Sequence, residues 1–142
     1  MEELIRQIFA QARLLGACQR FKGTEQTLEE IIGVFKTNQG LEFCLKHNFP
    51  NLATFRQFKP FDPSRYGIYI DAGNITLKNP QKVILIGRTT ATLNYDTLER
   101  HEVYLLHSAR AVVNAYKWAV VSVEQAQGTQ VVRNISGNAV IL

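Results

Sequence analysis

The chain has 142 residues, of which 46% are hydrophobic and 20% are charged, and its formal net charge is +4. These proportions are ordinary for a soluble globular protein. No run of about 18 apolar residues is present, which argues against a membrane-spanning helix. Glu2 and Glu3 argue against a secretory signal, and we expect Cys18 and Cys44 to be reduced thiols in a cytoplasmic protein.

Residues 1–65 are predicted to form a helical cap. Apolar residues recur at helical spacing, and Thr27 with Glu30 fits a capping box at the start of one helix. The predicted helices cover residues 2–20, a segment opened by Thr27, residues 41–47 and residues 50–58. Prolines and a glycine, at Pro60, Pro63 and Gly67, then mark the passage into the second half of the chain.

The stretch from Gly67 to Leu142 repeats itself every twenty residues. One column of this repeat is occupied by asparagine and a later one by valine: Asn74, Asn94, Asn114 and Asn134, then Val83, Val103 and Val123. A fixed period of this length is the mark of a solenoid, whose repeats bury their apolar faces only against one another. We therefore predict a mainly β fold over residues 66–142, a right-handed parallel β-helix of about four coils. An antiparallel β-sandwich is the structural alternative.

The asparagine column is interpreted as a turn ladder. Asn tolerates the left-handed backbone region, and amides stacked at the strand spacing of about 4.8 Å can bond to one another. The cap is expected to cover the open end of the first coil, because uncovered strand edges invite aggregation. No such cover is evident at the other end, so Val140, Ile141 and Leu142 predict a homo-oligomer assembled through the C-terminal coils, or a partner that closes this edge.

A ligand site is predicted where the cap meets the first coil. Aromatic and cationic side chains alternate there, as single-stranded nucleic acid or a nucleotide requires. The candidate ligand-binding residues are Phe55, Arg56, Phe58, Lys59, Arg65 and Tyr66. The competing interpretation is that these aromatic rings only seal the joint between cap and coil.

Other chemistry finds little support in the sequence. His101 and His107 lie about 20 Å apart in one straight strand, too far to share a metal ion. Asp96 and Glu99 are the best available pair for a carbohydrate-cleaving enzyme, and three aromatic residues offer a stacking surface: Tyr104, Tyr116 and Trp118. No nucleotide-binding, nucleophile or zinc motif is present. We therefore assign no catalytic residue, no metal ligand and no cofactor.

Two runs carry a resemblance to known proteins. Residues 108–115 (SARAVVNA) and 137–141 (GNAVI) resemble the Ala/Val-rich β-solenoid repeats of bacterial and phage proteins. As a whole, the chain resembles small proteins of Bacteroides-type gut bacteria and their mobile elements, a group for which no activity is implied. The function expected is a non-enzymatic interaction or binding module, with protein or nucleotide as ligand. The alternatives are a nucleotide- or oligonucleotide-binding protein and a small carbohydrate-active enzyme.

Overall fold

The computed structural model describes residues 3–4, 6, 8, 10 and 28–142. Glu3, Leu4, Arg6, Ile8 and Ala10 are helical, and the rest of the helix predicted at 2–20 lies outside the described residues, as does Thr27. Three helices and two 3-10 turns follow: α2 (Leu28–Phe35), α3 (Asn38–His47), α4 (Leu52–Arg56), η1 (Lys59–Phe61) and η2 (Pro63–Tyr66). No helix among the described residues is long and apolar enough to cross a membrane.

Side-chain caps set where two of these helices begin. The Thr37 hydroxyl accepts from the backbone N–H of Gly40 at 3.0 Å, so α3 starts at Asn38 rather than at residue 41. The Asn51 side chain accepts from Thr54 N at 2.8 Å and opens α4. Each cap satisfies a backbone donor that the first helical turn leaves without a partner.

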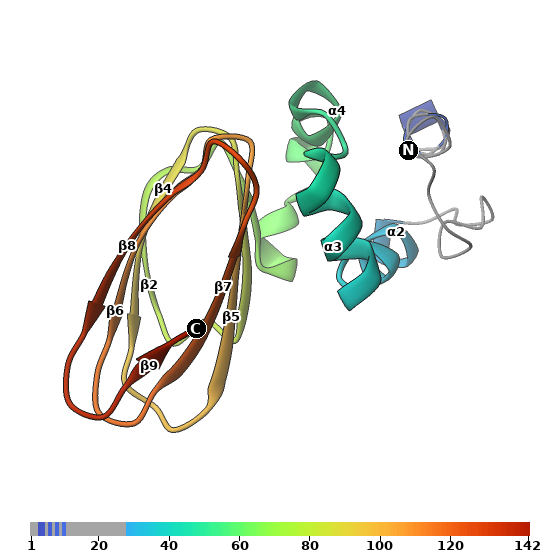
Figure 1. The fold of residues 1–142 in the computed structure, drawn as a ribbon. Coiled ribbons are helices and arrows are strands. Elements are labelled where there is room, and N and C mark those ends of the chain that lie inside the picture. The colour runs from blue at the N-terminus through green and yellow to red at the C-terminus, as the bar shows by residue number, and fades with distance from the viewer. Residues whose placement is uncertain (1–2, 5, 7, 9, 11–27) are drawn as a thin grey trace.

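The strands form two parallel sheets (Figure 1). Sheet A has the order β1-β3-β5-β7-β9, from β1 (Ile68–Ile70), β3 (Lys82–Ile86), β5 (Arg100–Leu106), β7 (Val120–Gln125) and β9 (Val140–Ile141). Sheet B has the order β2-β4-β6-β8, from β2 (Gly73–Lys78), β4 (Thr89–Tyr95), β6 (Arg110–Ala115) and β8 (Gln130–Ile135). Each coil contributes one strand to each sheet, so coil 1 is β1–β2 and coil 4 is β7–β8. The prediction of a mainly β parallel solenoid of about four coils is confirmed.

The interior of the solenoid is an apolar core between the two sheets. Inward columns continue from coil to coil: Val83 pairs with Val103, and Val103 pairs with Val123. Large and small side chains alternate along the axis, since the buried Tyr95 lies beside Ala115 in the next coil. Such alternation fills a narrow interior without overpacking.

The register of coil 1 corrects the predicted asparagine column. Strands β4, β6 and β8 are offset by twenty residues, but β2 and β4 are offset by sixteen, so Asn74 lies beside Thr90 and Lys78 lies beside Asn94. The connection after β2 is four residues shorter than the equivalent connection after β4. Asn74 is therefore not part of the ladder, and Asn94, Asn114 and Asn134 lie inside strands rather than in turns.

The three remaining asparagines are joined by their side chains. Asn114 Nδ2 donates to Asn94 Oδ1 at 3.0 Å, and Asn134 Nδ2 donates to Asn114 Oδ1 at 2.8 Å. The amides thus form a ladder on the outer face of sheet B, in the direction of the solenoid axis.

The described helices cover the outer face of sheet A. Ile84 and Ile86 of β3 and Leu106 of β5 share one core with helical residues, including Phe35 and Leu41. In Figure 1 the helices lie beside the sheet that contains β5 and β7. Outward-facing isoleucines and a leucine on β1, β3 and β5 therefore provide the apolar surface on which the described helices pack. That the cap closes the end of coil 1 stays a prediction.

The last coil places polar residues at interior positions. Arg133 occupies the column of Leu93 and Val113, and Gln125 occupies the column of Leu105. Gln125 Nε2 donates to the carbonyl oxygen of Thr129 at 3.1 Å, and Arg133 Nη2 donates to Gln125 Oε1 at 3.5 Å. Inward-pointing polar groups are one way in which natural sheets limit edge-to-edge association.

Candidate functional site

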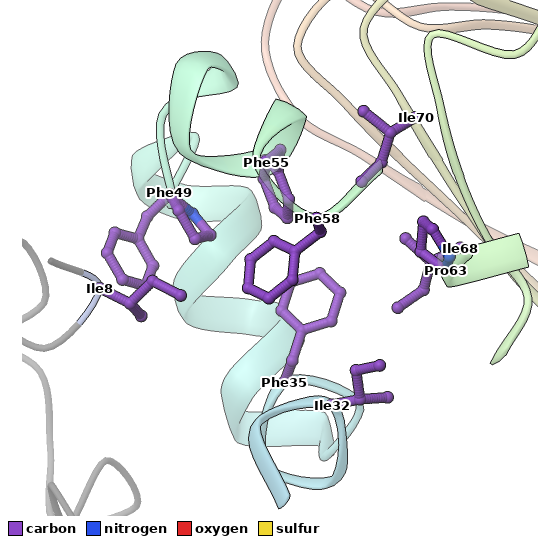
Figure 2. Close-up of a pocket in the computed structure, with 10 residues that line it drawn as sticks. Ile8, Ile32, Phe35, Phe49, Phe55, Phe58, Pro63, Ile68 and Ile70 are labelled. Atoms are coloured by element: carbon purple, nitrogen blue, oxygen red, sulfur yellow. The ribbon is translucent and has the colours of Figure 1, made fainter. Parts of the chain in front are cut away.

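The aromatic rings predicted to stack on a ligand are buried in the joint between the helices and sheet A. Phe55 is 4% exposed and Phe58 is 7% exposed. Both line a small apolar cavity of about 40 Å³ between the helices and β1 (Figure 2). Phe35 packs edge-on against Phe55 at a centroid distance of 5.8 Å. The stacking role predicted for Phe55 and Phe58 is therefore wrong, and the interpretation that they seal the joint holds.

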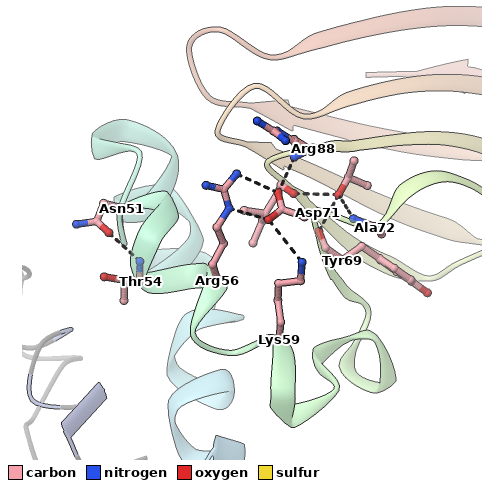
Figure 3. A network of polar contacts seen from close by, with 10 residues as sticks. Asn51, Thr54, Arg56, Lys59, Tyr69, Asp71, Ala72 and Arg88 are labelled. Carbon is pink, nitrogen blue, oxygen red and sulfur yellow. Dashed lines mark hydrogen bonds and ion pairs between the residues drawn. The ribbon is translucent and has the colours of Figure 1, made fainter.

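The cations predicted at this joint interact with Asp71, which follows β1 (Figure 3). Arg56 Nε donates to Asp71 Oδ2 at 2.7 Å, and Lys59 Nζ lies 3.8 Å from the same oxygen. The backbone N–H of Arg88 donates to Asp71 Oδ1 at 2.9 Å. The hydrogen bond from Arg56 is the main reason why the pKa of Asp71 lies below its ordinary value. Asp71 therefore links α4 to the corners of coils 1 and 2.

Arg65 and Tyr66 lie apart from this network. The guanidinium of Arg65 lies 4.8 Å from the centroid of the Tyr66 ring. Lys36 Nζ donates to the backbone carbonyl of Tyr66 at 2.9 Å, and this contact ties α2 to η2. The structure thus divides the six predicted residues into a buried aromatic pair, an ion-paired cation pair and a cation–π pair, rather than one ligand surface.

A different groove lies beside Arg56, between α4 and the corners where each chain turn passes from sheet A to sheet B. We call it the corner groove; it has a volume of about 510 Å³. It is lined by Leu52, Arg56, Gly73, Asn74, Gly87, Arg88, Thr89, Thr90, His107, Ser108 and Arg110. No carboxylate is among these lining residues, and the neighbouring Asp71 is already paired with Arg56 and with the backbone N–H of Arg88. The three lining arginines therefore outnumber the one adjacent carboxylate.

Arg88 and Arg110 are the two lining arginines whose side chains have no partner among the described residues. Both are exposed, and within the described part of the chain neither guanidinium has a hydrogen bond or an ion pair. The third arginine, Arg56, is already paired with Asp71. Two unpaired guanidiniums that face a groove without carboxylates form an arrangement suited to phosphate or carboxylate oxygens.

His107 forms part of the groove wall and also holds α4 in place. Its Nε2 donates to the carbonyl oxygen of Pro50 at 2.6 Å, and its ring packs edge-on against Phe55 at 5.6 Å. Because a carbonyl only accepts, the neutral ring carries its proton on Nε2. Burial lowers the pKa of His107 and outweighs the hydrogen bond to Pro50, which raises it, and the charge of Arg56 lowers it further. His107 is therefore neutral at pH 7.

The backbone of the groove is unusual at two successive positions. His107 and Ser108 have φ values of 52° and 66°, which non-glycine residues rarely adopt. The equivalent positions in the neighbouring coils include Gly87 and Gly128, with φ values of 69° and 88°. Strained backbone concentrates at functional sites, and both residues line the corner groove.

The other predicted sites have structural partners. Asp96 Oδ1 accepts from Asn79 Nδ2 at 2.8 Å, and this contact lowers the pKa of Asp96, so the carboxyl group is unsuited to act as a general acid. His101 is fully buried, with Nε2 3.1 Å from Thr97 Oγ1. Tyr116 and Trp118 are exposed on the opposite corner, whereas Tyr104 is buried on sheet A. No cluster of metal-binding side chains occurs among the described residues.

A second polar groove, of about 690 Å³, lies between α3 and the outer face of sheet A. It contains Glu42, Glu102, Glu124 and Arg100. Glu102 lies beside Ser122 rather than beside Glu124, so the two carboxylates of neighbouring coils are diagonal. Tyr104 donates to Glu102 Oε1 at 2.9 Å, and the pKa of Tyr104 is raised by burial first and by this bond second.

The corner groove was missed in the sequence because its residues are distant from one another and only the fold unites them. One signal was present: in the twenty-residue alignment, Gly87 and Arg88 share columns with His107 and Ser108. A glycine in such a column marks a corner with positive φ. The polar residues beside it in the sequence then lie on the outside of that corner.

Comparisons with protein-family models, curated proteins and solved structures gave no significant match to this chain. The resemblance to Bacteroides-type proteins therefore remains a prediction, and it transfers no residue role.

Proposed function

We propose that this protein is a non-enzymatic binding module that holds a phosphate-bearing ligand in the corner groove. The observation that carries the proposal is the pair of exposed guanidiniums, of Arg88 and Arg110, on a groove without a carboxylate. Hydroxyl groups of Thr90 and Ser108 line the same groove and supply neutral donors. The proposal keeps the nucleotide-type ligand expected from the sequence but moves its site from the buried rings to the corner.

The groove supports binding rather than turnover. Of its titratable side chains, Arg56 is paired with Asp71, and the Nε2 proton of His107 is held by the carbonyl of Pro50. Arginine remains protonated at all relevant pH values, so Arg88 and Arg110 attract and orient anions without exchanging protons.

Isothermal titration calorimetry with inorganic phosphate, at low ionic strength, tests this proposal. Arg88→Ala and Arg110→Ala should each weaken binding about tenfold or more, because hydrogen bonds to charged groups are worth roughly 1.5–3 kcal/mol. Arg133→Ala is the control, since it removes an arginine of β8 that lies outside the groove and, among the described residues, bonds only to Gln125. Failure of the wild-type protein to bind phosphate, or an equal loss in all three variants, would refute the proposal.

Self-association through the C-terminal coils is a second candidate. Four of the exposed large hydrophobic side chains belong to the last two strands and their ends: Val132, Ile135, Val140 and Leu142. Native mass spectrometry of the 142-residue chain, with Val140→Ser and Val132→Ser, tests it. An oligomer that dissociates in the variants supports self-association, and a monomeric wild-type protein contradicts it. The inward-facing Arg133 of β8 favours the monomer.

We also propose that the protein resides in the cytoplasm. Cys44 is a free, buried thiol, and burial raises its pKa, so it is in its unreactive protonated form. This is consistent with a reducing environment.

A further inference from the structure

The two free arginines of the corner groove come from neighbouring coils. Arg110 is the first residue of β6 and lies beside Thr90 of β4, and Arg88 precedes Thr90 by two residues. With strands about 4.8 Å apart and a rise of about 3.3 Å per residue, the two Cα atoms lie roughly 8 Å apart. Two long side chains with this separation can converge on a single ligand from different coils.

Within the coils, the cations that line the groove belong to coils 2 and 3; the third, Arg56, comes from α4. In coil 4, the positions equivalent to His107, Ser108 and Arg110 are held by uncharged residues: Gln127, Gly128 and Gln130. In coil 1, Asp71 lies at this corner, and Asn74 lies beside Thr90. A polyanion that followed the solenoid axis would find no further cation on either side along this corner column.

The size of the groove agrees with a compact ligand. Its volume of about 510 Å³ lies within the range of about 300–1,000 Å³ that is typical of small-molecule sites. The wall opposite the corners is formed by α4, through Leu52 and Arg56, and this wall limits how far a ligand can extend sideways.

We infer that the ligand carries a diphosphate group, with Arg88 and Arg110 each binding one of its two phosphoryl groups. The inference rests on the proposed function and makes it more specific. A guanidinium donates two parallel N–H bonds to phosphate oxygens, so two guanidiniums match two adjacent phosphoryl groups. One phosphoryl group alone would engage both arginines less well, because they approach from separate coils.

The test is calorimetric titration of the full chain with inorganic phosphate, with inorganic pyrophosphate and with citrate, a tricarboxylate of similar charge to pyrophosphate. We expect pyrophosphate to bind at least tenfold more tightly than phosphate, and citrate no more tightly than phosphate. Equal affinities for phosphate and pyrophosphate would overturn the diphosphate inference but leave phosphate binding intact. Affinity for citrate equal to that for pyrophosphate would also overturn it, because charge alone would then explain the preference.

A double-mutant cycle shows whether both arginines contact one ligand. Arg88→Ala and Arg110→Ala should each weaken pyrophosphate binding about tenfold or more, and the double variant should lose the preference for pyrophosphate over phosphate. Arg88→Lys keeps the charge but loses the planar fork, so its affinity should fall between those of the wild type and Arg88→Ala. A single variant that keeps the wild-type affinity for pyrophosphate would overturn the inference, because its arginine would then contact neither phosphoryl group. Neither side chain has a described partner, and unchanged melting temperatures would verify that the variants fold.

A final comparison distinguishes the source of the diphosphate. A nucleoside diphosphate that binds more tightly than pyrophosphate would support the inference and identify a nucleotide ligand, with contacts to the nucleoside in the rest of the groove. Equal affinities would support recognition of the diphosphate alone. Binding of pyrophosphate but not of the nucleoside diphosphate would support a free diphosphate as the ligand. If no anion binds, both the inference and the proposed function fail.

Discussion

Replacement of Asn114 by alanine tests whether the amide ladder stabilises the solenoid. Asn114 makes two side-chain hydrogen bonds, at 3.0 Å to Asn94 and at 2.8 Å from Asn134. Each such bond contributes about 0.5–1.5 kcal/mol net. The lower part of that range applies here, because the ladder lies on an open face and the released amides can bond to water. Asn114→Ala should therefore lower the free energy of unfolding by about 1–2 kcal/mol.

The chain contains its own controls for this prediction. Asn94 and Asn134 each make one ladder bond, so their alanine variants should lose about half as much. Asn74 is an exposed asparagine on β2, outside the ladder, and Asn74→Ala should change the free energy of unfolding by less than about 0.5 kcal/mol. Urea unfolding followed by far-ultraviolet circular dichroism measures all four. Equal losses for Asn114→Ala and Asn74→Ala would show that the amides do not stabilise the stack.

Three further predictions concern the core, the corners and the response to pH. Leu93→Ala empties a fully buried interior position and should cost about 2–5 kcal/mol in urea unfolding. Gly87→Ala and Gly73→Ala both place a side chain at a positive φ of about 70°, but only at Gly87 would the added Cβ lie 2.5 Å from Asp71 Oδ1. Gly87→Ala should therefore lower the melting temperature more than Gly73→Ala does. Equal shifts in the two variants would contradict the close approach of Asp71 to Gly87. His107 has a lowered pKa in the folded state, so unfolding binds a proton and the free energy of unfolding should fall as pH drops below the ordinary histidine value of about 6.5. In His107→Gln, the urea midpoint should depend less steeply on pH between pH 7 and 5. An unchanged pH dependence would exclude this histidine as the cause.

The solenoid was predictable because its columns repeat. A period of twenty residues is visible wherever the corners have equal length, and the valine column at Val83, Val103 and Val123 matches the observed register. The error at Asn74 has the opposite cause. The corner after β2 is four residues shorter, and Asn79 closes it by exchanging hydrogen bonds with the Asp96 side chain and backbone. A shortened corner leaves the strands intact, but the residues before it pair with residues sixteen positions later rather than twenty. A fixed count of twenty therefore misaligned β2.

The candidate site was less predictable than the fold. The alternation of aromatic and cationic residues between Phe55 and Tyr66 fits both a ligand site and a sealed joint between helices and sheet. The sequence cannot separate the two, because it does not show which rings become buried. The corner groove depends on Arg56, Arg88 and Arg110, which lie on α4 and on the corners of two coils. Only the lateral placement of the helices on sheet A brings α4 beside those corners.

That lateral placement has a signal in the strands. A parallel strand that is buried on both faces is apolar throughout, whereas a strand with one open face alternates. On sheet A, β3 contains Val83-Ile84-Leu85-Ile86, four consecutive residues that are fully buried. On sheet B, residues 90–94 of β4 alternate between polar and apolar side chains, and the polar ones face outward. On β7 the alternation returns, with Ser122 and Glu124 on the outer face. The pattern therefore assigns the helices to one sheet and to its first three strands.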